Sequence, residues 1–208
     1  MNVYFEESTM SNLIFTGQKN KHLVTSGFAE TRNYEPYNGK GHEGIDYKDK
    51  KGTSIYCEIN GLVEDISYQQ NVYGHRILVK TNLGYLTKEL EGCIIYHIYG
   101  HLFKVDNNIK IKKFVKAGQK IGQMGNSGFC MYQNSSGELV KVTEEQAKDS
   151  KFESGVHLHL SFYTGLKNTY LIDLIKQKLN LNNNDFYLNQ WGRYYLHPDY
   201  FFKFLGMY

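Results

Sequence analysis

The 208-residue sequence has little proline, little cysteine and no long apolar run. Without such a run, no segment is predicted to span a membrane. The three cysteines, Cys57, Cys93 and Cys130, lack the spacing of a metal site, and an odd number gives no complete disulfide framework. We therefore expect each cysteine to pack as a small apolar residue. Proline occurs only at Pro36 and Pro198.

The sequence also lacks a cluster of positive charge. Its formal net charge of +3 is small and spread along the chain, which argues against a dedicated nucleic-acid binder. The same weak charge is compatible with approach to an anionic surface such as a bacterial wall. Residues 1–7 carry acids where a secretory signal would carry basic residues followed by an apolar run. We therefore expect a protein that works in the cytoplasm, or that leaves the cell by lysis or as part of a particle.

What the sequence does contain is a series of short strand-like segments separated by turn residues. This pattern begins near Leu23 and predicts a mainly β fold with an all-β core. The length suits one domain with a substantial core, or one domain with an appendage. The segments that we expect to be strands are 23–28, 54–58, 62–68, 75–81 and 96–102.

Two regions depart from the strand pattern and predict short helices. Residues 129–154 are polar, and Thr143 to Gln146 resembles a capping box that begins a helix. Later, apolar residues recur at helical spacing over 171–179, and His197-Pro198-Asp199 suits the first turn of a last helix. We expect these last two helices to pack on the sheet without taking part in chemistry.

The most informative stretch is 155–162, which contains His157 and His159 within an apolar run. In a β-strand, alternate side chains point to opposite faces. Both histidines would then lie on one face, while Leu158 and Leu160 on the other face enter the core. Such a strand suits metal binding or proton transfer. The alternative is a pair of surface histidines on a half-exposed strand.

Two further segments carry residues of the same chemistry. If 41–47 is extended, His42 and Asp46 share a face, with Gly44 between them allowing close approach to the backbone. The alternative for this segment is a polar edge strand. Alternation over 96–102 places His97 and His101 on one face.

A single sheet can bring these segments together. Catalytic zinc uses three protein ligands and an open position for water. Two imidazoles and one carboxylate suit zinc, and two further histidines can then orient water, accept its proton and stabilise an oxyanion. Spacing alone does not say which of the five residues bind the metal; they are His42, Asp46, His101, His157 and His159.

The motifs resemble those of the lysostaphin-type (LytM-like) zinc metallopeptidases, which are peptidoglycan endopeptidases. The resemblance rests on His42-x-Gly44-x-Asp46, on Tyr99-Gly-His101-Leu102 and on the segment 156–159. It extends between these motifs and covers roughly residues 23–163.

The resemblance implies a function for each motif. It implies that His42, Asp46 and His159 bind one Zn²⁺ per chain, and that His101 and His157 are the catalytic pair. It also implies an antiparallel β-sheet with a groove, known as the duplicated hybrid motif, and substrates in the peptide stems or bridges of bacterial peptidoglycan.

A loop tyrosine, Tyr34 or Tyr37, would supply a phenol to the oxyanion, as in some relatives; the alternative is a solvated loop residue. The other histidines match no motif position, and we interpret them as ordinary surface or core residues. They are His22, His75, His97 and His197.

The chain departs from the family pattern in three places. Residues 129–154 form an insertion before His157, 83–92 look like an added loop, and 166–208 have no counterpart. The expected organisation is an N-terminal arm (1–22), a zinc peptidase domain (23–165) with its insertion, and a helical, aromatic-rich extension (166–208). We expect the insertion to narrow the groove and to select among peptide bridges; the alternative is a solvated loop that the surface tolerates.

The leading hypothesis is a zinc-dependent peptidoglycan endopeptidase. The composition, rich in Asn, Lys and Tyr, and the missing secretory signal suggest a phage product, either a lysis enzyme or a tail-associated enzyme that contacts other tail proteins. The alternatives are a non-catalytic module that binds the wall or activates another hydrolase, and a structural tail component. Non-catalytic relatives typically lose metal ligands, whereas this chain retains all five residues.

Overall fold

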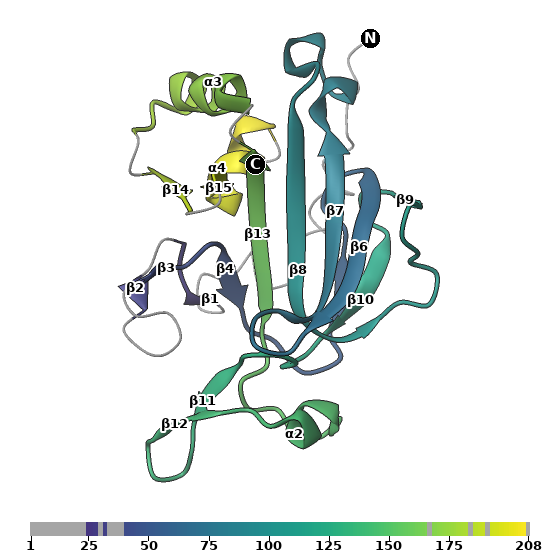
Figure 1. The fold of residues 1–208 in the computed structure, drawn as a ribbon, viewed down its shortest axis with the longest axis vertical. Coiled ribbons are helices and arrows are strands. Elements are labelled where there is room, and N and C mark those ends of the chain that lie inside the picture. The colour runs from purple at the N-terminus through teal and green to yellow at the C-terminus, as the bar shows by residue number, and fades with distance from the viewer. Residues whose placement is uncertain are drawn as a thin grey trace.

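The computed structural model describes residues 24–28, 31–32, 40–165, 168–182, 185–189 and 192–206. Its centre is an antiparallel sheet, which confirms the predicted fold class. Long neighbouring strands dominate the sheet in Figure 1. These are β6 (Gly61–Gln69), β7 (Gly74–Asn82), β8 (Ile94–Val105) and β13 (Leu158–Gly165).

Shorter strands complete the sheet in the order β1-β4-β13-β8-β7-β6-β9. Strand β10 pairs with β8 and with β5. A separate pair is formed by β2 (Thr31–Arg32) and β3 (Lys40–Gly41). The bounds of the shorter sheet strands are Val24–Ser26 for β1, Ile45–Tyr47 for β4, Ser54–Tyr56 for β5, Phe114–Val115 for β9 and Lys120–Met124 for β10.

Strand β13 joins the segments that carry the predicted site. His159 lies opposite Asp46 of β4 on one side and opposite Gly100 of β8 on the other. Leu158 and Leu160 on the other face of β13 are fully buried in the core, as the alternation predicts. The larger core cluster therefore lies on one face of the sheet and holds β13 in the register that presents His159 on the opposite face.

The alternation that we expected along 96–102 is wrong at His101. His97 lies in the core, with its ring 4.8 Å from that of Phe162, whereas the His101 ring lies 4.4 Å from that of His157 on the opposite face. His101 has a φ of 58°, and the pairing of β7 with β8 is irregular between His75 and Ile77. This left-handed residue breaks the two-residue period, so its side chain changes face.

The insertion forms a small unit below the sheet in Figure 1. The predicted helix is present as α2 (Glu144–Lys148), and its capping box between Thr143 and Gln146 is complete. A hairpin of β11 (Met131–Gln133) and β12 (Leu139–Lys141) was not predicted. The Lys51 ammonium donates to backbone carbonyls at the end of α2, those of Ala147 (2.9 Å) and Asp149 (2.8 Å) among them, and so ties the helix to the turn before β5.

The C-terminal region mixes helices with strands. The two expected helices are α3 (Thr169–Leu179) and α4 (Pro198–Phe204). Between them, β14 (Phe186–Leu188) and β15 (Arg193–Leu196) were not predicted, and β15 pairs with β13. The expected loop at 83–92 contains two short 3₁₀ helices, η2 (Leu83–Tyr85) and η3 (Lys88–Leu90). Among the described residues, no helix has the length and apolarity needed to cross a membrane.

Candidate active site

His42, Asp46 and His159 converge on one point of the sheet. His42 Nε2 lies 3.0 Å from His159 Nδ1, and Asp46 Oδ1 lies 3.2 Å from the first nitrogen and 3.0 Å from the second. Bonds of about 2.0–2.1 Å to a tetrahedral zinc would place such ligand atoms roughly 3.3 Å apart. All three side chains are buried. The three donors therefore fit a zinc ion in chemical type and in separation.

One backbone and one side-chain contact orient the imidazole of His42. Its Nδ1 lies 2.9 Å from the Gly27 carbonyl oxygen and 3.2 Å from Ser26 Oγ, both near the end of β1. Because a carbonyl can only accept, Nδ1–H donates to Gly27, and the lone pair of Nε2 faces Asp46 and His159. This is the tautomer that a metal ligand requires.

Gly44 makes room for the same cluster, as its place between His42 and Asp46 suggested. A Cβ atom at this position would lie 2.5 Å from the Leu160 carbonyl oxygen and 2.8 Å from Cε1 of the His159 ring. No L-residue with a side chain fits there without displacing β13 or the imidazole.

The electrostatics keep Asp46 ionised. Burial raises the pKa of its carboxyl, but the nearby charges of His42 and His157 and hydrogen bonds from His159 and His42 act in the opposite direction. The net effect is a pKa well below the usual value of an aspartate. The cluster therefore contains a carboxylate at neutral pH, which is the form that binds a cation.

His101 and His157 form a second pair beside this cluster. Their nitrogens are fixed in the same way: His101 Nδ1–H donates to the Ser127 carbonyl at 2.8 Å, and His157 Nδ1–H donates to the Gly155 carbonyl at 2.9 Å. The lone pair of each Nε2 is then left for proton transfer. His157 Nε2 lies 3.8 Å from Asp46 Oδ2, so the histidine pair lies directly beside the cluster of His42, Asp46 and His159.

His101 is held neutral. Burial lowers the pKa of its imidazole, and the charges of His157 and His159 lower it further. Asp46 and the hydrogen bond to Ser127 act in the opposite direction but do not compensate, so the pKa lies well below the usual value. A neutral imidazole can accept a proton, as a general base must.

Three residues near the site were not identified from the sequence. The Tyr73 ring lies 5.0 Å from that of His159, and its carbonyl accepts from the His101 backbone N–H at 2.6 Å. Its hydroxyl donates to Glu43 (3.1 Å), which also accepts from Asn189 of the C-terminal region (3.1 Å). Glu43 thus links the segment that bears His42 to Tyr73 and to Asn189. Glu43 occupies the variable position between His42 and Gly44, and no local pattern distinguishes Tyr73 or Asn189.

The remaining predicted residues have varied outcomes. Tyr34, Tyr37 and His22 lie outside the described residues. His97 is buried in the core, and His75 packs against Tyr68, with 4.7 Å between their rings.

Cys57 and Cys93 pack in the apolar core as expected. Cys130 is also buried, but our expectation that it packs as an ordinary apolar residue is wrong. Its Sγ lies 3.3 Å from His101 Nδ1, so it is not an ordinary apolar core residue.

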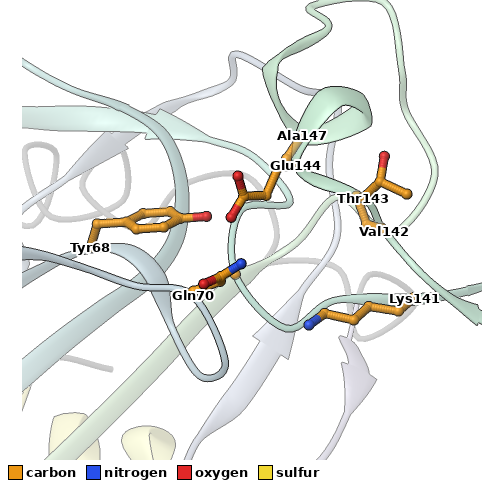
Figure 2. Close-up of a pocket in the computed structure, with 8 residues that line it drawn as sticks. Tyr68, Gln70, Lys141, Val142, Thr143, Glu144 and Ala147 are labelled. Carbon is orange, nitrogen blue, oxygen red and sulfur yellow. The ribbon is translucent and has the colours of Figure 1, made fainter.

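A pocket of about 220 Å³ opens between the insertion and the end of β6. Figure 2 shows the Tyr68 hydroxyl and the Glu144 carboxylate pointing toward one another across it, with the Gln70 amide beside them and the Lys141 ammonium at one side. Gly128, next to the Ser127 that holds His101, also lines this pocket. The pocket therefore offers both charge signs close to the histidine pair.

Two imidazoles and a carboxylate beside a further pair of histidines are the donor types of a metallohydrolase. Asp46, His101 and His159 lie in strands of the sheet, whereas His42 and His157 precede β4 and β13. The chain belongs to peptidase family M23, whose profile matches residues 40–171.

Two proteins that are described as peptidases match part of the chain. An uncharacterised metalloprotease of Haemophilus influenzae is 29% identical over 107 residues, which are 50% of this chain and 20% of that protein. The peptidoglycan DD-endopeptidase ShyC of Vibrio cholerae is 34% identical over 107 residues, 50% of this chain and 22% of that protein. The matched residues thus span about a fifth of the length of both relatives.

Among solved structures, the catalytic domain of lysostaphin from Staphylococcus simulans aligns with a TM-score of 0.48 and 20% identity. The alignment covers 71% of this chain and 85% of that domain.

Proposed function

We propose that the protein is a zinc-dependent endopeptidase that hydrolyses peptide bonds in the stems or cross-bridges of bacterial peptidoglycan. In this proposal His42, Asp46 and His159 hold one zinc ion, and His101 and His157 are the catalytic pair. The observation that carries the proposal is the convergence of these two sets on one face of the sheet. Membership of peptidase family M23 supports the same conclusion.

The chemistry divides between the two sets. A bound zinc ion would polarise the scissile carbonyl and lower the pKa of an attacking water molecule. The Nε2 atoms of His101 and His157 can accept the proton of that water and return it to the leaving amine, because each Nδ1–H is bound to a backbone carbonyl. Once protonated, either ring can donate a hydrogen bond to the oxyanion.

The backbone holds the catalytic pair in position. The Ser127 hydroxyl donates to the Leu102 carbonyl at 2.7 Å and accepts from the His75 backbone N–H at 2.9 Å. The Ser127 carbonyl that receives His101 Nδ1–H is thereby fixed to two strands. The His101 ring therefore needs little reorganisation before proton transfer, which favours catalysis.

We also propose a biological setting and a role for each part of the chain. The composition rich in Asn, Lys and Tyr supports a phage-encoded lysis or tail-associated enzyme that acts at the bacterial wall. The zinc peptidase domain comprises residues 23–165. The extension comprises residues 166–208. The pocket beside α2 supports a role for 129–154 in substrate selection.

Digestion of purified peptidoglycans that differ in their cross-bridges tests the activity. We expect soluble fragments with new amino termini at one type of peptide bond, identified by mass spectrometry. A wall that is bound but not cut would support the non-catalytic module instead. Fragments with new reducing ends but intact peptides would contradict an endopeptidase.

A further inference from the structure

Cys130 lies directly against the histidine pair. Its Sγ is 3.3 Å from His101 Nδ1 and 3.5 Å from the Ser127 carbonyl oxygen, the same oxygen that receives His101 Nδ1–H at 2.8 Å. Cys130 is 1% exposed, whereas the His157 side chain is 15% exposed. The chemistry proposed above gives this sulfur no role.

The three side chains form a second set of metal-type donors. One donor atom from each of His101, Cys130 and His157 lies within 4.8 Å of the other two. Thiolate and imidazole together favour soft or borderline cations such as Zn²⁺ or Cd²⁺. Bonds of about 2.3 Å to sulfur and 2.0–2.1 Å to nitrogen place these atoms roughly 3.6 Å apart around a tetrahedral ion. The observed 3.3 Å between Cys130 Sγ and His101 Nδ1 is close to this separation, and the His157 donor atom lies within 4.8 Å of both.

This set shares no residue with the first cluster. Its nearest approach in the described contacts is the 3.8 Å between His157 Nε2 and Asp46 Oδ2. A cation could therefore occupy it while another remains with His42, Asp46 and His159. His157 is the most exposed member of the set, with 15% of its side chain accessible to solvent.

We propose that His101, Cys130 and His157 form a second, inhibitory site for a thiophilic divalent cation, with His101 binding through Nδ1. The metal binding stands independently of the catalytic assignment. The inhibition rests on the proposed function, because it requires His101 and His157 to act in hydrolysis.

The inhibition follows from the position of protons. On binding, the Cys130 thiol releases its proton to water and its sulfur bonds to the cation as thiolate. The cation takes the place of the proton on His101 Nδ1, which ends the hydrogen bond to the Ser127 carbonyl, and that proton moves through water to Nε2. His101 Nε2 then has no lone pair and cannot accept a proton from water. His157 also commits one nitrogen to the cation, and hydrolysis stops while the first site stays filled.

Cadmium titration of the zinc-loaded protein tests the site, because cadmium–thiolate bonds absorb in the ultraviolet. We expect about one further equivalent to bind, with this absorption rising as hydrolysis falls. In Cys130→Ser the absorption should disappear, and half-inhibition should need about tenfold more cadmium or more. Cys93→Ser is the matched control, because that thiol is buried in the core away from the histidines, and it should behave as the unaltered protein.

Asp46→Ala separates this proposal from the proposed function. This variant should retain the cadmium–thiolate absorption although the first site is impaired. The same absorption in a protein that hydrolyses no wall would support the second site and contradict the catalytic proposal. The second site is overturned if Cys130→Ser retains the absorption and the inhibition, or if the zinc-loaded protein gives no cadmium–thiolate absorption.

Discussion

At the scale of single residues, the candidate metal cluster depends on the absence of one side chain. Gly44→Ala places a methyl group 2.5 Å from the Leu160 carbonyl oxygen and within van der Waals overlap of the His159 ring. The carbonyl belongs to the central strand, so the imidazole must move. We expect zinc affinity to fall by about 10–100-fold, the range seen when the supports of metal ligands are lost. Competition with a chelator measures this affinity.

The control for that substitution is Gly165→Ala, in the same strand as His159. A Cβ atom at Gly165 meets nothing within 4 Å. Its zinc affinity should equal that of the unaltered protein. Equal affinity in Gly44→Ala would show that the close approach of Gly44 to His159 is unimportant for the metal.

A second residue-scale feature is the carboxyl of Glu58, which is buried in the core. Tyr99 donates its hydroxyl hydrogen to this carboxyl, and Cys57 and His97 are the other titratable groups around the hydroxyl. Burial raises the pKa of Glu58 to about 8, although the hydrogen bonds from Tyr99 and the backbone oppose this. Glu58 is therefore neutral in the folded protein at neutral pH.

This raised pKa predicts a pH-dependent stability. The unfolded carboxyl ionises near pH 4–5, so the stabilisation present below that pH is lost as pH rises toward 8. Relative to Glu58→Gln, the unaltered protein should lose on the order of 4 kcal/mol of unfolding free energy over this interval. Urea unfolding at several pH values measures the difference. Parallel pH profiles of the two proteins would show that Glu58 does not titrate in this window.

At the scale of elements, the insertion places a helix at the edge of the pocket that Gly128 also lines. Its first turn contributes Glu144 to the pocket, opposite Tyr68 of β6. Replacing 143–151 by a short Gly-Ser linker removes α2 and retains both Cys130 and Val142, which are buried. Zinc content should stay unchanged, whereas the ratio of cleavage rates on two different peptide bridges should shift by about tenfold.

The hairpin in the same insertion supplies the control. Shortening its turn at 134–138 leaves the residues that line the pocket in place. That variant should cleave both bridges in the original proportion. If the linker variant also keeps the original proportion, α2 has no part in substrate selection.

Elements differ in how far the sequence predicts them. The long strands were predictable because apolar residues alternate with polar ones, and α2 because Thr143 and Gln146 form a capping box. The β11–β12 hairpin was missed because its three-residue strands pair only with each other and bury little apolar surface. Strands β14 and β15 were missed because their aromatic residues do not alternate with polar ones.

The candidate site was likewise predictable only in part from the sequence. The five predicted residues lie in local motifs, so their convergence was predictable. The face of His101 was not, because a left-handed backbone at a histidine leaves no trace in residue type. The contacts of Glu43 and Cys130 depend on segments distant in sequence, which no local pattern reveals.

At the scale of the whole molecule, the C-terminal region packs on strand β13. Phe202 of α4 is fully buried and packs edge-on against Phe162 of β13 at 5.2 Å. Phe202→Ala should therefore lower the free energy of unfolding by about 3–5 kcal/mol. Urea unfolding, followed by both backbone and tyrosine signals, should show one shifted transition.

Tyr170→Ala is the control, because this aromatic residue of α3 is 55% exposed. It should change the unfolding free energy by less than about 0.5 kcal/mol. An early separate transition in Phe202→Ala, with the remainder unfolding as before, would show that the extension is an independent unit.

The central claim is the division of five residues into three metal ligands and a catalytic pair. Zinc content after dialysis against zinc-free buffer, measured in Asp46→Ala, His101→Ala and His157→Ala alongside wall hydrolysis, tests it most directly. Asp46→Ala should lose the metal. His101→Ala and His157→Ala should retain close to one zinc per chain and lose about 10²–10⁴-fold in rate. Undiminished zinc in Asp46→Ala, or near-normal hydrolysis by either histidine variant, would contradict it.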